Sequence, residues 1–211
     1  MGKTVINTSN KLHWAKRISY FVILAGAAVM AGWLFDIREL KSIYAGWISM
    51  KFTTAFSFVI SGITLYFLAR AREGEHEKAL VALSMTSLVL SLIMGLFFFS
   101  TIFNVQTGIE FMFVSDPGDP GTILPGRPSM LTVTNFLFIA FAAILTILKP
   151  DKLSFKLRAI GCVVGLVGLV AVVGYVFHIG LLSYSLPGIN NPMAAHTALL
   201  FVLLGTGFLC L

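Results

Sequence analysis

The sequence predicts an all-α integral membrane protein with six transmembrane helices, arranged as three tandem, parallel helical hairpins. Three observations favour this fold class: an excess of apolar residues, six long stretches without charge, and a motif that occurs three times. Of the 211 residues, 57% are hydrophobic and 11% are charged, whereas a soluble domain carries roughly 25% charged residues.

The apolar residues are gathered into six runs without charge. Each run has 18 to 24 residues, and a membrane-spanning helix needs about 20. A segment in lipid must satisfy its own backbone hydrogen bonds, so each run is expected to be helical. The runs are 18–35, 52–69, 80–103, 131–148, 159–177 and 193–211. We therefore expect one membrane domain, with an arm at 1–17 and hairpin repeats at 18–69, 80–148 and 159–211.

The positive charges alternate between connections. Eleven Lys and Arg residues lie in the N-terminal arm and in 70–79 and 149–158, against four in 36–51, 104–130 and 178–192. Cytoplasmic connections carry the excess of Lys and Arg. We expect a multi-pass protein of the cell inner (plasma) membrane with both termini in the cytoplasm. The net charge of +6 then reflects topology, and we expect no nucleic-acid partner.

A motif anchored on threonine recurs in register at the start of the second, fourth and sixth runs. It consists of the anchor, a residue four positions earlier, a Phe four positions later and a small residue eight positions later. The copies are Met50, Thr54, Phe58 and Gly62; Pro128, Thr132, Phe136 and Ala140; and Met193, Thr197, Phe201 and Gly205. Steps of four place each set on one helix face.

Two interpretations of this motif are compatible. Small residues and threonines let helices approach closely in a membrane, so the stripe is typical of helix packing. The functional interpretation is an outward-facing pocket where the three threonine-bearing helix starts converge, because the positive ends of helices favour an anion or a carbonyl ligand. We expect these helices to be capped at Ser49, at Ser129, and at Asn191 with Pro192 in the first helical position.

A polar residue follows a Phe at the end of the first, third and fifth runs: Asp36, Asn104 and His178. Polar residues at span boundaries commonly cap helices, and a ligand contact is the alternative. His178 and His196 flank a short connection, so they are candidates for haem or metal ligation or for a pH response. Neither belongs to a diagnostic ligand motif. We expect no cofactor and no metal, with haem held by these two histidines as the alternative.

Asn135 lies inside the fourth run, where a buried amide requires a partner on another helix or contacts a ligand. It completes the set of candidate ligand-binding residues, which are His196, Thr197, Met193, His178, Thr132, Asn135, Thr54, Asp36 and Asn104. No phosphate-binding loop, paired Glu/His metal motif or activated nucleophile is present in the sequence, so we predict no catalytic residue and no enzyme activity. The absence of charge inside the runs argues against an ion-driven transporter.

Three segments resemble the N-terminal multi-span membrane region of bacterial and archaeal histidine kinases and diguanylate cyclases. They are residues 47–55, residues 126–136, and residues 174–201 with the phrase Pro-Met-Ala-Ala-His-Thr-Ala-Leu-Leu-Phe. The chain departs from the family pattern at 128–130, which reads Pro-Ser-Met where the family tends to have Met-Ser-Pro. In that family the membrane region precedes PAS, histidine kinase or diguanylate cyclase domains, and this chain carries no such output domain.

The resemblance implies a membrane sensory module that couples an outer-face or bilayer stimulus to a cytoplasmic output domain. Its expected partners are the lipid bilayer and a cytoplasmic signalling domain or partner subunit, in a homodimer or a larger complex. The alternative is a structural or cofactor-binding subunit of a larger membrane complex, such as a respiratory or photosynthetic assembly.

Overall fold

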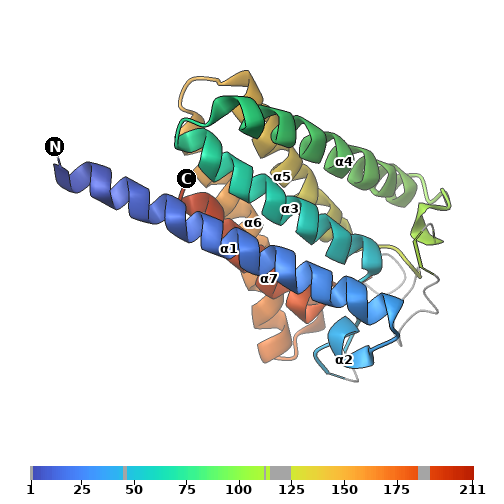
Figure 1. The fold of residues 1–211 in the computed structure, drawn as a ribbon. Helices are drawn as coiled ribbons and strands as arrows, with labels where there is room; N and C mark the ends of the chain where they lie inside the picture. The colour runs from blue at the N-terminus through green and yellow to red at the C-terminus, as the bar shows by residue number, and fades with distance from the viewer. Residues whose placement is uncertain (1, 45–46, 112, 115–124, 185–190) are drawn as a thin grey trace.

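The computed structural model describes residues 2–44, 47–111, 113–114, 125–184 and 191–211. These residues form seven α-helices and two short 3-10 helices, and no strand occurs among them (Figure 1). The helices are α1 (Gly2–Leu34), α2 (Arg38–Lys41), α3 (Phe52–Arg72), α4 (His76–Ile102), η1 (Ile109–Phe111), α5 (Met130–Leu148), α6 (Leu153–Val176), η2 (Gly180–Ser183) and α7 (Ala195–Leu209).

Five of these helices are long and apolar enough to cross a membrane: Asn10–Leu34 within α1, and all of α3, α4, α5 and α6. The outer surface is apolar as well. Along α4, Val81, Met85, Leu88 and Leu92 are all more than half exposed, and their spacing of three or four residues makes one continuous apolar stripe. An apolar outside is what a lipid environment requires, so the prediction of a helical membrane protein is confirmed.

The core is made by three consecutive helix pairs, α1 with α3, α4 with α5, and α6 with α7. The second helix of each pair carries one motif phenylalanine into the centre of the bundle. Phe58, Phe136 and Phe201 are fully buried, and their three ring centroids lie 4.9, 4.9 and 5.0 Å apart. Aromatic pairs at this separation contribute about 0.5–1.5 kcal/mol each beyond their buried area, so the three rings stabilise the meeting of the pairs.

The bundle has two different ends. We call the end at which α3, α5 and α7 begin the threonine end, and the end at which they finish the basic end. Helix α1 has 33 residues, a length of about 50 Å. Its N-terminal turns project beyond the bundle at the basic end, where the C-terminus also lies (Figure 1). From Gly2 onward, the predicted arm at 1–17 is therefore helical and forms the N-terminal part of α1.

Two of the three predicted helix starts are wrong. Ser129 caps α5 as predicted, with its Oγ accepting a hydrogen bond from the Thr132 amide at 3.2 Å. Helices α3 and α7 begin three and four residues after the predicted caps, at Phe52 and Ala195. The residues before them stay extended because they bond to the preceding connections: the Met50 amide donates to the Lys41 carbonyl at 2.9 Å, and the Met193 amide to the Ser183 carbonyl at 3.0 Å.

Candidate functional site

The three motif threonines line a single cavity at the threonine end. The cavity has a volume of about 20 Å³. Each helix pair contributes one threonine and the short extended segment that precedes its helix. The lining residues are Ile48, Ser49, Met50, Lys51 and Thr54; Arg127, Pro128, Ser129 and Thr132; and Asn191, Pro192, Met193, Ala194 and Thr197.

The backbone enters the three helices in the same way. The residues before the helices, Lys51, Ser129 and Ala194, have φ of −66°, −64° and −63° and ψ of 148°, 150° and 147°. The threonine is therefore the third residue of each helix, where the backbone amide has no partner within the helix. No N-cap side chain accepts from these amides in α3 or α7. Three helix starts around one space make its potential positive.

The size of this cavity limits what it can hold. A space of about 10–15 Å³ or more accommodates one water molecule, provided that it meets two to four polar partners. With hydroxyl groups and helix amides around it, the 20 Å³ cavity fits one water molecule or one small ion. A larger ligand would require the three helix starts to move apart.

A buried ion pair lies beside the cavity. Arg127 and Glu110 are 3% and 5% exposed, and the Arg127 Nε donates to the Glu110 Oε1 at 3.0 Å. The guanidinium also donates through Nη2 to the Val105 carbonyl at 2.7 Å, and the Ser100 Oγ lies 2.9 Å from the same carboxylate oxygen. These bonds fasten the connection that follows α4 to the segment that precedes α5.

The Glu110 carboxylate is held in its charged form. Burial alone would raise its pKa, but hydrogen bonds from its backbone and from Ser100, together with the charge of Arg127, hold the pKa below the usual value of 4.5. Its second oxygen, Oε2, is buried without a hydrogen-bond partner, as is the Thr53 Oγ1. Glu110 and Thr53 line a second small cavity, of about 10 Å³, together with the buried Lys51.

Asp36, Asn104 and His178 do not line the threonine cavity. Each is exposed and has a left-handed backbone, with φ of 55°, 50° and 56°. They end α1, α4 and α6, and the residue after each donates its amide to the carbonyl five positions back, at 2.8, 3.1 and 2.9 Å. This is the bonding pattern of a Schellman motif, in which Asn and Asp adopt the left-handed conformation more readily than most residues. These three residues therefore terminate helices.

The remaining candidates lie deeper. Both imidazole nitrogens of His196 are buried and have no hydrogen-bond partner of regular geometry among the described residues, although the ring lies near the Lys41 backbone, whereas His178 is exposed. No group of three or more His, Cys, Asp or Glu side chains that could hold a metal occurs among the described residues. The Asn135 Nδ2 lies 3.5 Å from the Val164 carbonyl of α6, so this amide faces a partner helix, as the packing interpretation expects.

Four buried polar residues of this region are absent from the predicted ligand-binding set: Arg127, Glu110, Lys51 and Asn191, the last of which was predicted only as a helix cap. Asn191 donates through Nδ2 to the Arg127 carbonyl at 2.8 Å, which joins the third helix pair to the second. Arg127 follows Gly126, whose φ is +74° and whose added Cβ would clash with the Glu110 carbonyl oxygen, so the chain at Glu110 packs directly on this turn. The backbone angle and this contact belong to the tertiary structure, and no local sequence pattern pointed to Glu110.

Comparisons of the chain with protein-family models, with characterised proteins and with solved structures gave no match.

Proposed function

We propose that this chain is a membrane sensory module in which an outer-face or bilayer stimulus alters the packing at the threonine end, and α7 transmits the change to the basic end. In this proposal α7 is the sixth span, the three helix pairs are tandem parallel hairpins, and the basic end with both termini faces the cytoplasm. The positive-inside distribution of Lys and Arg supports this orientation. The meeting of Phe58, Phe136 and Phe201 supports the tandem arrangement.

The observation that carries the proposal is the small cavity at the start of three helices, lined by the three motif threonines. Buried polar groups normally have hydrogen-bond partners, so each exception needs an explanation. Four of the five orphaned side-chain atoms among the described residues, in Glu110, Thr53 and His196, lie at the threonine end, and the fifth, the Ser61 Oγ, lies further along α3. In the proposal, this positive and incompletely bonded region has a second arrangement, in which these groups gain partners from outside the bundle.

Helix α7 provides the connection between the two ends. It begins at the cavity with Thr197, passes the central Phe201, and ends beside Cys210 at the basic end. It packs against α6, α1 and α3, and close glycine contacts with α6 make it move with that helix. A displacement of the first turn of α7 would therefore be transmitted to its last turn, where an output domain or a partner subunit would be attached.

The test uses Cys210 as a native reporter. The chain has two cysteines, both free, with Cys162 exposed and Cys210 partly buried. In the Cys162→Ser variant, reconstituted in nanodiscs, we expect the rate of Cys210 labelling by a maleimide, divided by the rate of free glutathione under the same conditions to remove the intrinsic pH dependence of a thiol, to change with at least one of three conditions: pH, chloride concentration or bilayer thickness. The Thr197→Val and His196→Gln variants, placed in the Cys162→Ser background, should lose this response while keeping the same melting temperature.

Thr206→Val is the matched control, because Thr206 is exposed on the same helix and its hydroxyl donates to the Val202 carbonyl of that helix at 2.9 Å. The control should respond as the parent does. A labelling rate that none of the three conditions changes, or a response that Thr197→Val and His196→Gln both retain, would overturn the proposal. Either result would favour a structural subunit of a larger complex.

A further inference from the structure

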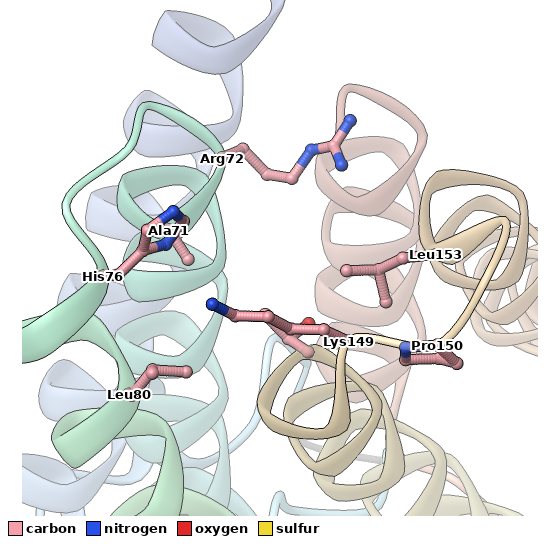
Figure 2. A pocket seen from close by; sticks show the side chains of 8 residues that line it. Ala71, Arg72, His76, Leu80, Lys149, Pro150 and Leu153 are labelled. Carbon is pink, nitrogen blue, oxygen red and sulfur yellow. The ribbon is translucent and has the colours of Figure 1, made fainter.

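A large pocket opens at the basic end, far from the cavity described above. It has a volume of about 400 Å³ and lies where α3 ends, α4 begins, α5 ends and α6 begins. Its lining consists of Ala71, Arg72, His76, Leu80, Thr146, Lys149, Pro150 and Leu153. Figure 2 shows the side chains of Arg72 and Lys149 extending into this space from opposite sides.

The charge of the pocket is positive. Arg72, Lys149 and His76 line it, and no carboxylate does. Among the described residues, none of these three side chains forms a salt bridge.

The nearest acidic residues in sequence are engaged elsewhere. Glu73 accepts from the Lys16 Nζ at 2.5 Å, and Glu75 pairs with Arg70. Glu77 and Asp151 do not line the pocket.

The helix termini do not account for this charge. Two helices begin at the pocket and two end there, so the positive and negative ends of their dipoles oppose each other. The cationic side chains therefore determine what the pocket attracts. A guanidinium binds two oxygens of a phosphate at once, and an ammonium adds a second point charge.

The shape of the pocket fits a phosphate with an apolar part attached. A volume of 400 Å³ is within the range of about 300–1,000 Å³ that small-molecule sites occupy, and it is much larger than a single ion needs. The side chains of Leu80, Pro150 and Leu153 make part of the wall apolar. Basic pockets between transmembrane helices at the level of the headgroups are suited to anionic lipids.

We propose that this pocket binds a phosphate group, held between Arg72 and Lys149, with the rest of the ligand against the apolar wall. The phosphate belongs to an anionic lipid headgroup or to a soluble phosphate ester, and both share this recognition. The proposal is independent of the sensory function, because it concerns the opposite end of the bundle and requires no conformational change.

The experiment has two arms, both with the full chain. In the first, inorganic phosphate and glycerol 3-phosphate are titrated against the protein in phosphatidylcholine nanodiscs, and binding is measured by calorimetry. In the second, nanodiscs of phosphatidylcholine and phosphatidylglycerol are used, and native mass spectrometry counts the phosphatidylglycerol molecules that stay bound. Binding in the first arm identifies a soluble ligand, and retention in the second arm alone identifies a lipid.

In whichever arm the wild type binds, Arg72→Gln/Lys149→Gln is expected to weaken binding by about tenfold or more, because each charge-assisted hydrogen bond contributes substantially. The matched control is Lys156→Gln/Arg158→Gln, which removes two exposed cations of α6 outside the pocket and should bind as the wild type does. Arg72 and Lys149 are also exposed, so both double variants should melt with the wild type.

A wild type that binds in neither arm would overturn the proposal. So would equal weakening in the two double variants, since that result would indicate diffuse attraction to the basic end as a whole.

Discussion

In the first and third helix pairs, an aromatic side chain of the first helix donates a hydrogen bond to the backbone just before the second helix. The Trp33 Nε1 of α1 donates to the Met50 carbonyl at 2.8 Å, and the Tyr175 hydroxyl of α6 donates to the Met193 carbonyl at 2.7 Å. The amides of the same two methionines bond to the preceding connection. The second pair has Pro128 at the corresponding position, and proline has no amide hydrogen to donate.

The second pair uses charge where the others use aromatic residues. The position equivalent to Trp33 and Tyr175 is Thr101, whose hydroxyl donates to the Phe97 carbonyl of its own helix at 2.8 Å. The Arg127–Glu110 pair fastens the connection instead. A buried ion pair is costly to desolvate, and it depends strongly on both partners being present. The same backbone geometry at the helix start is therefore held by neutral hydrogen bonds in the first and third pairs and by an ion pair in the second. The ion pair is the more sensitive of the two to loss of one partner.

The pairs also differ in how closely their helices approach. A Cβ added to Gly62 would lie 2.6 Å from the Ile23 side chain, and one added to Gly205 would lie 2.5 Å from the Gly165 Cα. The second pair has Ala140 at that position. Its own glycine in α4, Gly95, has open space around it, with nothing within 4 Å of an added Cβ. Close backbone packing therefore belongs to the first and third pairs.

The largest loss of stability is expected from breaking the Arg127–Glu110 ion pair of the second helix pair. Arg127→Met should lower the free energy of unfolding by about 3–5 kcal/mol, because it leaves the Glu110 carboxylate buried without its cation. Thermal or denaturant unfolding in detergent measures this loss. The double variant Glu110→Gln/Arg127→Met should be more stable than Arg127→Met alone, and Arg158→Met, at an exposed position, should be nearly neutral. A loss of less than about 1 kcal/mol in Arg127→Met would mean that the ion pair is not what fastens this connection.

The next effect tests the close packing of the third pair. Gly205→Ala should cost about 1–3 kcal/mol, because the new methyl group meets the backbone of α6 and forces the helices apart. Gly95→Ala is the matched change in the second pair, and it should be neutral or stabilising by up to about 1 kcal/mol because alanine favours the helix. Unfolding of both variants under the same conditions compares them. Equal stability of the two variants would contradict the difference between the pairs.

A smaller effect is expected from the aromatic fastening of the third pair. Tyr175→Phe should cost about 1 kcal/mol, since the Met193 carbonyl loses its donor while the ring keeps its packing. Thr101→Val, at the equivalent place in α4, should change the stability by less than about 0.5 kcal/mol. Equal losses of stability in the two variants would show that the Tyr175 hydrogen bond does not distinguish the third pair from the second.

The smallest effect is the pH dependence that Glu110 gives to the second pair. Because the pKa of Glu110 lies below its usual value in the folded state, the folded protein binds fewer protons than the unfolded chain does near pH 4.5. Its contribution to stability is therefore present above that pH and is lost as the pH falls through the folded pKa. Melting temperatures from pH 7 down to pH 3 should fall more steeply in the wild type than in Glu110→Gln. Parallel curves would show that Glu110 titrates alike in both states.

Local sequence patterns were sufficient for the features that repeat along the helices. The motif residues are four positions apart, so each motif phenylalanine shares a helix face with its threonine. The three rings, of Phe58, Phe136 and Phe201, meet in the centre of the bundle. The same register brought Thr54, Thr132 and Thr197 to one cavity. Such patterns are readable because the helix period fixes which residues share a face, whatever the helix packs against.

The starts of α3 and α7 were not readable in the same way. Ser49 and Asn191 are good capping residues, but the bonds of Met50 and Met193 to the preceding connections delay the helix by two residues in α3 and three in α7. A capping preference of about 1 kcal/mol is easily outweighed by tertiary hydrogen bonds and burial. Glu110 and Arg127 were missed for a related reason, since a charged residue in a connection is normally exposed.

The sequence by itself determined that this chain is helical and belongs in a membrane, because the length and apolarity of the runs leave lipid-exposed backbone no other way to satisfy its hydrogen bonds. Only the tertiary structure decided which polar groups would be enclosed at the threonine end and which cations would remain unpaired at the basic end. Those outcomes depend on residues that are far apart in the chain, such as Glu110 with Arg127 and Arg72 with Lys149. No local pattern specifies that they meet.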